Sequence, residues 1–242
     1  GARYVAPPTI RMKAARRRFA DTYYRPGQQY RLLSDGAEAG SVTVKKLNAC
    51  DAMGAEVEVS GSAKMEGAGG TLATNSDSLR GRASARREPT DAEAKAMMRL
   101  VSPIFRRNGL DDPVEQGALN SLHAADLNGD GRAELIGFYG TGAKSQHTLF
   151  IIAEPQGGGF KPTLLLFHKS RDKYGDDQRY HQFVDGIDLD GDGISEVITS
   201  GNDPRSTNDF SYTIYKKRRG HWQSIYVGGG LKCASEMGGE VY

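Results

Sequence analysis

Short apolar segments separated by polar turns fill the second half of the chain. Such segments end at Asp126 and resume at Glu134, and the order is repeated further on, where they end at Asp188 and resume at Glu196. In each copy two more apolar segments follow, at His147–Ala153 and Phe160–Phe167 in the first and at Phe210–Tyr215 and His221–Val227 in the second. The pattern predicts two units of four short strands, and internal repeats of this size are typical of repeated sheet units such as propeller blades.

Two of these segments contain unbroken apolar runs, Leu149–Ile152 and Leu164–Phe167. Strands that are covered on both faces read this way, whereas strands with one face in water alternate between apolar and polar residues. Both runs are therefore predicted to be buried on both faces.

The first half of the chain predicts an arm, a small sheet and a linker. Residues 1–28 are rich in arginine and interrupted by proline, which favours a basic arm with a short helix over Ile10–Ala20. Residues 29–60 carry strand signals, including the alternation of Ala55–Val59, and predict a small antiparallel sheet. Residues 61–89 lose that pattern and predict a linker, so we expect three regions, 1–28, 29–89 and 90–242.

A helix is predicted directly after the linker. Thr90 and Glu93 have the spacing of a capping box, and an apolar stripe follows them at helical spacing. Pro103 lies within this stripe, so a break or kink in the helix is expected there. We expect the helix of residues 91–107 to pack against a sheet, which gives a mainly β fold with one or two helices.

The candidate chemistry lies in the turns between the first and second strand of each unit. Both turns follow the pattern D-L-[ND]-G-D-G-x-x-E, and they lie 62 positions apart (188 − 126). Glycine at position 6 permits a tight curl, so that oxygen atoms of positions 1, 3, 5, 7 and 9 can converge on one cation. The predicted ligands are Asp126, Asn128, Asp130, Arg132 (backbone carbonyl) and Glu134 in the first turn, and Asp188, Asp190, Asp192, Ile194 (backbone carbonyl) and Glu196 in the second.

Oxygen ligands of this kind predict Ca²⁺ at two sites. An EF-hand is excluded, because position 12 is Gly137 in one copy and Thr199 in the other and the flanking segments are strands. Asp-Gly and Asn-Gly also form hairpin turns without metal, but three acidic or amide side chains would repel one another without a cation. The second turn offers four carboxylates and the first offers three, so we expect the second to bind calcium more tightly.

These duplicated turns in matched strand context resemble FG-GAP or VCBS-type repeats. Those repeats are the calcium-binding blade units of integrin α-subunit propellers and of many bacterial surface proteins, and the resemblance covers roughly residues 119–230. The layout also resembles bacterial envelope proteins of unassigned function. Two units cannot close a propeller, which takes about 4–8 blades. We therefore expect an open or sandwiched pair of blade-like sheets, covered by the helix and by the N-terminal sheet.

Charge and cysteine content bear on the partners and the location. The chain has 32 basic and 30 acidic residues, which disfavours nucleic acid as the main partner, and no apolar run is long enough to span a bilayer. Cys50 and Cys233 are the two cysteines. We expect them to form a disulfide, because calcium turns suit an extracytoplasmic protein, and two free buried thiols are the alternative.

The sequence contains no motif that specifies a reaction: no close pair of metal-binding histidines, no nucleophile elbow and no phosphate loop. The leading interpretation is a non-enzymatic, calcium-stabilised module in the periplasm, on the envelope or outside the cell, which binds a protein or glycan through loops. The candidate loops are 169–180 and 201–209, with Tyr174, Tyr180 and Tyr212 as contact residues. The alternatives are a hydrolase with a site that the sequence does not reveal, and binding of an anionic surface or nucleic acid through residues 11–18.

Overall fold

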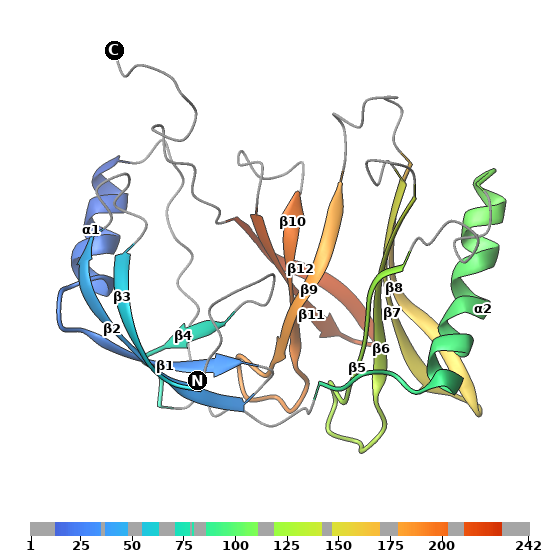
Figure 1. Ribbon diagram of the computed structural model, residues 1–242, viewed down its shortest axis with the longest axis horizontal. Helices are drawn as coiled ribbons and strands as arrows, with labels where there is room; N and C mark the ends of the chain where they lie inside the picture. Colours follow the sequence, from blue (N-terminus) through green and yellow to red (C-terminus); the bar gives the residue numbers. More distant parts are fainter. Residues whose placement is uncertain are drawn as a thin grey trace, which may run out of the picture.

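A computed structural model gives the fold of the protein (Figure 1). The structure describes residues 13–34, 37–47, 55–62, 71–77, 79, 86–110, 119–141, 147–169, 179–202 and 211–228. These residues form two helices and twelve strands, and the strands make three four-stranded antiparallel sheets. The prediction of a mainly β fold is confirmed.

Each predicted four-strand unit forms one sheet. The first repeat sheet consists of β5 (Leu119–Ala125), β6 (Glu134–Thr141), β7 (His147–Gln156) and β8 (Gly159–Lys169), side by side in chain order. The second repeat sheet consists of β9 (Tyr180–Ile187), β10 (Glu196–Asn202), β11 (Ser211–Arg218) and β12 (His221–Gly228), again in chain order. Each acidic turn therefore joins the first strand of its sheet to the second.

The N-terminal sheet has the order β3-β2-β1-β4. Its strands are β1 (Gln29–Ser34), β2 (Ala37–Leu47), β3 (Ala55–Gly61) and β4 (Leu72–Thr74). The strand β4 lies inside the stretch that we predicted to be a linker, and it pairs with β1. That prediction is wrong at this point because three residues are too few to show a period of two.

The helix α1 (Lys13–Tyr23) lies beside the N-terminal sheet (Figure 1). It ends three residues after the predicted end at Ala20, and residues 1–12 lie outside the described part of the chain. The first proline after this stretch is Pro26, so no proline interrupts the extra turn.

The helix α2 (Asp91–Arg107) begins at the predicted capping box. The Glu93 backbone N–H donates to Thr90 Oγ1 at 3.3 Å, and the Thr90 backbone N–H donates to Glu93 Oε2 at 2.8 Å. Pro103 lies inside the helix, which continues to Arg107, so the break expected there does not occur. The side chains of Val101, Ile104 and Phe105 around this proline are buried, and their packing holds the last turns in place.

We predict that replacing Thr90 with alanine lowers the free energy of unfolding by about 1 kcal/mol, because alanine has no side-chain oxygen to accept the N–H group at the start of the helix. The Arg87 guanidinium, by donating to both carboxylate oxygens of Glu93 at 2.7 Å, lowers the pKa of Glu93 to about 2. This pairing stabilises the fold above the ordinary glutamate pKa and is lost as pH falls towards 2. Urea unfolding of the alanine variant, with Thr90→Ser as the control that keeps the cap, measures the effect; equal stability of the two variants contradicts it.

Three apolar cores separate four layers, which run in the order α2, first repeat sheet, second repeat sheet and N-terminal sheet (Figure 1). The core between α2 and the first repeat sheet includes Met97, Val101, Phe105, Leu135 and Leu149. The core between the two repeat sheets includes Ile136, Phe150, Val197, Tyr215 and Trp222. The core between the second repeat sheet and the N-terminal sheet includes Leu33, Val184, Ile198 and Ile214. The two repeat sheets are thus stacked face to face. The helix α2 covers the outer face of the first, and the N-terminal sheet covers the outer face of the second.

The two unbroken apolar runs differ in burial. All residues of Leu149–Ile152 are buried, which confirms the prediction for β7. The prediction for Leu164–Phe167 is wrong, because Leu165 is 43% exposed and its neighbours are only partly buried. The strand β8 is at the edge of its sheet, so it has a neighbouring strand on one side only.

Candidate metal centre

The two acidic turns lie next to each other, at the same end of the two repeat sheets (Figure 1). The Ser195 backbone N–H of the second turn donates to the Leu127 carbonyl oxygen of the first at 2.6 Å. The Leu127 side chain is fully buried in the core between the repeat sheets, where its Cδ2 faces Gly186 of β9. The sequence alone does not predict this contact, because 62 positions separate the two turns. The stacking of the two repeat sheets brings them together.

The first aspartate of each turn holds the backbone in its curled form. Asp126 accepts hydrogen bonds from the backbone N–H groups of Gly129, Asp130 and Gly131. Asp188 accepts the corresponding bonds from Gly191, Asp192 and Gly193. The glycine at position 6 has a positive φ in both turns, 81° at Gly131 and 91° at Gly193, as the spacing requires.

In the first turn, the remaining side chains converge on Glu134, the first residue of β6. Glu134 Oε2 accepts the Leu127 backbone N–H at 2.7 Å, and Oε1 accepts Asn128 Nδ2 at 3.0 Å. Asn128 Nδ2 also donates to Asp130 Oδ2 at 3.3 Å. The Asn128 amide therefore bridges the two carboxylates.

The Glu134 carboxylate is buried in an acidic setting. The residue is 2% exposed. Burial, together with the negative charges of Glu154 and Asp130, raises the pKa of Glu134 to about 7. Among the described residues, no lysine or arginine forms an ion pair with Asp126, Asp130 or Glu134, although the outer rim at Gly129–Arg132 is open to solvent. This turn therefore combines a buried carboxylate, two further acids and an approach from solvent, and calcium binding to it stays a prediction.

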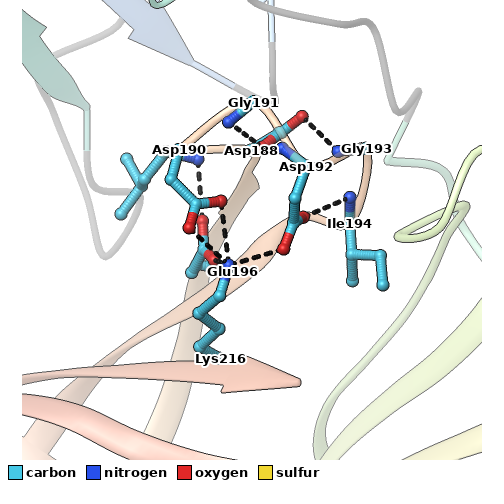
Figure 2. A network of polar contacts seen from close by, with 9 residues as sticks. Asp188, Asp190, Gly191, Asp192, Gly193, Ile194, Glu196 and Lys216 are labelled. Carbon is cyan, nitrogen blue, oxygen red and sulfur yellow. Dashed lines mark hydrogen bonds and ion pairs between the residues drawn. The ribbon is translucent and has the colours of Figure 1, made fainter. Parts of the chain in front are cut away.

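In the second turn, a lysine ammonium lies where the carboxylates converge (Figure 2). Lys216 of β11 donates from Nζ to Glu196 Oε1 at 2.7 Å, to Asp190 Oδ1 at 2.8 Å and to Asp192 Oδ2 at 2.8 Å. The Lys216 side chain is 10% exposed and that of Glu196 is 1% exposed, while Asp190 and Asp192 are about half exposed at 49% and 42%. Three of the four side chains predicted to bind calcium in this turn are thus bound to the Lys216 ammonium.

The charges of this group are coupled. Burial alone would lower the pKa of the Lys216 ammonium, but the three carboxylates together raise it above the ordinary lysine value. The Lys216 ammonium lowers the pKa of Asp192. Burial raises the pKa of Glu196, and the bond from Lys216 opposes that rise. The ammonium is therefore held in its charged form by the turn.

The same position of the first unit carries the opposite charge. The register that pairs Val197 with Tyr215 places Lys216 across from Glu196. The register that pairs Leu135 with Ala153 places Glu154 across from Glu134 in the first repeat sheet. Glu154 accepts hydrogen bonds from Lys217 Nζ at 2.6 Å and from Trp222 Nε1 at 3.3 Å, both from the second repeat sheet. The two turns thus share their sequence pattern but differ in the residue on the neighbouring strand.

The structure brings together most of the predicted ligands. Carboxylate oxygens of Asp188, Asp190 and Glu196 lie within 4.8 Å of one another, close enough to hold a metal ion in the absence of the lysine. The Arg132 and Ile194 backbone N–H groups donate to Asp130 and Asp192, and the roles of their carbonyl oxygens stay predictions. Lys216 and Glu154 were missed by sequence reasoning. The repeat period would have found them, because 62 positions separate these two residues as well (216 − 154).

Other predicted functional residues contribute less. Tyr180 is partly buried and packs against Phe138, with ring centroids 6.2 Å apart, so it belongs to the core between the repeat sheets. Tyr212 on β11 is 38% exposed. Tyr174, Cys50, Cys233 and most of the two candidate binding loops lie outside the described residues. Of the basic stretch 11–18, residues 13–18 form the start of α1, and residues 11 and 12 lie outside the described part of the chain.

The described residues thus define a class of protein: two stacked four-stranded antiparallel sheets, each with an acidic turn between its first two strands. Comparison with protein-family models, with curated proteins and with solved structures found no match to this chain. No helix in the described part of the chain has the length and apolar character needed to cross a membrane.

Proposed function

We propose that the protein is a non-enzymatic, calcium-stabilised module of the FG-GAP or VCBS type that works outside the cytoplasm. The observation that carries the proposal is the buried carboxylate of Glu134, which faces Asp130 and Asn128 with no cationic side chain bound to it among the described residues. A calcium ion at this turn would neutralise that carboxylate and would be held by Asp126, Asn128, Asp130 and Glu134.

The role of the ion in this proposal is structural. It links the end of β5 to the start of β6, and it adjoins the contact between the two turns. By mass action, an ion present at tenfold its Kd adds about 1.4 kcal/mol to the free energy of unfolding. The stabilised sheets would then present their loops to a protein or glycan partner, since loops on a rigid scaffold commonly carry recognition.

The first test adds calcium to the metal-free protein. Titration calorimetry measures the binding, and thermal unfolding measures the stabilisation. We predict that calcium binds and raises the melting temperature, and that Asp130→Asn weakens binding at least about tenfold because one charged ligand is lost. Asp130→Asn keeps an oxygen to accept the Arg132 N–H, so the turn itself is preserved. The matched control is Asp91→Asn, which changes an exposed acid at the start of α2. Absence of calcium binding by the unmodified protein, or equal binding by both variants, overturns the proposal.

A further inference from the structure

Calcium and Lys216 cannot use the second turn at the same time. The ammonium already contacts both oxygens of Asp190 and one oxygen each of Asp192 and Glu196, so the carboxylates that would bind an ion are occupied. A calcium ion would have to displace Nζ from all three, and the displaced ammonium would stay close to a doubly charged cation.

The displacement is opposed by the way Lys216 is held. The lysine is tethered on β11, directly across from Glu196, so its ammonium is present at a high effective concentration that no added ion competes with easily. Its side chain is 10% exposed, so moving it away from the carboxylates would leave a buried charge without a partner.

The first unit lacks this arrangement. Its residue at the equivalent position is Glu154, which adds a negative charge next to Glu134 and is bound to Lys217 and Trp222 of the other sheet. The two turns have the same sequence pattern, and they differ in the charge of the residue at this one position on the neighbouring strand.

We infer that Lys216 takes the place of calcium in the second turn, so that of the two acidic turns the first binds calcium and the second is neutralised by the lysine. This inference rests on the proposed function for the first site only. It reverses the ranking drawn from the number of carboxylates, because the turn with more acids also contains its own counter-charge.

The test compares calcium stoichiometry and calcium-induced thermal stabilisation in four proteins: the unmodified chain, Asp192→Asn, Lys216→Met and Lys161→Met. Methionine replaces the unbranched aliphatic stem of lysine, one atom shorter and without the charge, and Lys161 on β8 is an exposed lysine that serves as the control. Proteins are purified in calcium and then freed of it, so that a variant that depends on the ion can be recovered.

We expect one equivalent of calcium for the unmodified chain, for Asp192→Asn and for Lys161→Met. Lys216→Met should melt at a lower temperature than the unmodified chain without calcium, should bind a second equivalent, and should gain more from calcium in its melting temperature. Two equivalents in the unmodified chain, one of them lost in Asp192→Asn, overturn the inference, as does a folded Lys216→Met that gains no site.

The outcomes separate the two proposals. If the unmodified chain binds no calcium, the proposed function fails, while binding of one equivalent by Lys216→Met still supports the lysine inference and its absence overturns it. If Lys216→Met does not fold even with calcium, the comparison of the unmodified chain with Asp192→Asn decides: unchanged stoichiometry and affinity support the inference, and a lost or weakened equivalent overturns it.

Discussion

Replacing Glu134 with glutamine is expected to stabilise the protein without calcium near pH 8 and to destabilise it when calcium is present. Without the ion, the ionised carboxylate is buried beside other acids, and its neutral isostere avoids that cost while one oxygen still accepts the Leu127 N–H. With the ion, the same substitution removes a charged ligand. The effect of one substitution therefore changes sign with calcium.

The pH dependence of the calcium-free protein follows from the same group. The pKa of Glu134 is raised from 4.5 to about 7 by burial, so the folded chain binds an extra proton between these values and loses stability as pH rises through them. A shift of this size corresponds to at most about 3 kcal/mol at pH above 7. Calcium should abolish this loss, because the ion stabilises the ionised carboxylate.

Urea unfolding at about pH 5 and about pH 8, with and without calcium, measures these effects on the unmodified chain and on Glu134→Gln. Because every other titrating group is common to the two proteins, their difference reports on Glu134 alone. If the two calcium-free proteins differ in stability by the same amount at both pH values, this carboxylate is not buried as described. If calcium stabilises both proteins equally, Glu134 is not a calcium ligand.

Shortening Leu127 to alanine is expected to lower the free energy of unfolding by about 3 kcal/mol. The side chain is 1% exposed and lies in the core between the repeat sheets, so its removal leaves a cavity there. The matched control is Leu189→Ala, at the same position of the second turn, where the side chain is only partly buried and the loss should be smaller.

Gly186 provides the complementary test of this contact. A methyl group at Gly186 would lie 2.7 Å from Leu127 Cδ2, so Gly186→Ala should also destabilise the fold, by about 1–3 kcal/mol. The double variant, Leu127→Ala with Gly186→Ala, has room for the new methyl group. Its loss in free energy of unfolding should be smaller than the sum of the two single losses by at least about 0.5 kcal/mol. Strict additivity in urea unfolding would show that Leu127 does not pack on Gly186.

The periodic parts of the fold were predictable from the sequence, and the isolated parts were not. The four-strand units, the turns between their strands and the start of α2 at Thr90 follow from repeated apolar segments and from a capping box, which are local patterns. The strand β4 was missed because it is stabilised by its pairing with β1, which is distant in the sequence. The partial exposure of β8 depends on its place at the edge of a sheet, which local hydrophobicity does not encode.

The candidate site was predictable in the same unequal way. The acidic side chains of each turn are close in sequence, so their spacing alone places them together. Lys216 lies 20 positions from Glu196 and reaches it only through the pairing of β10 with β11 (216 − 196). Counting the carboxylates of the turn therefore leaves out the positive charge of Lys216.

The hydrogen bond from the Ser195 N–H to the Leu127 carbonyl has a consequence for local unfolding. Fraying of either turn breaks this bond, so the two turns open more readily together than one at a time, and they behave as one cooperative unit. Order imposed on the first turn by an ion reduces the conformational entropy still to be lost by the second. Slowed amide hydrogen exchange at Ser195 would then report on an ion bound some sixty residues away in the chain.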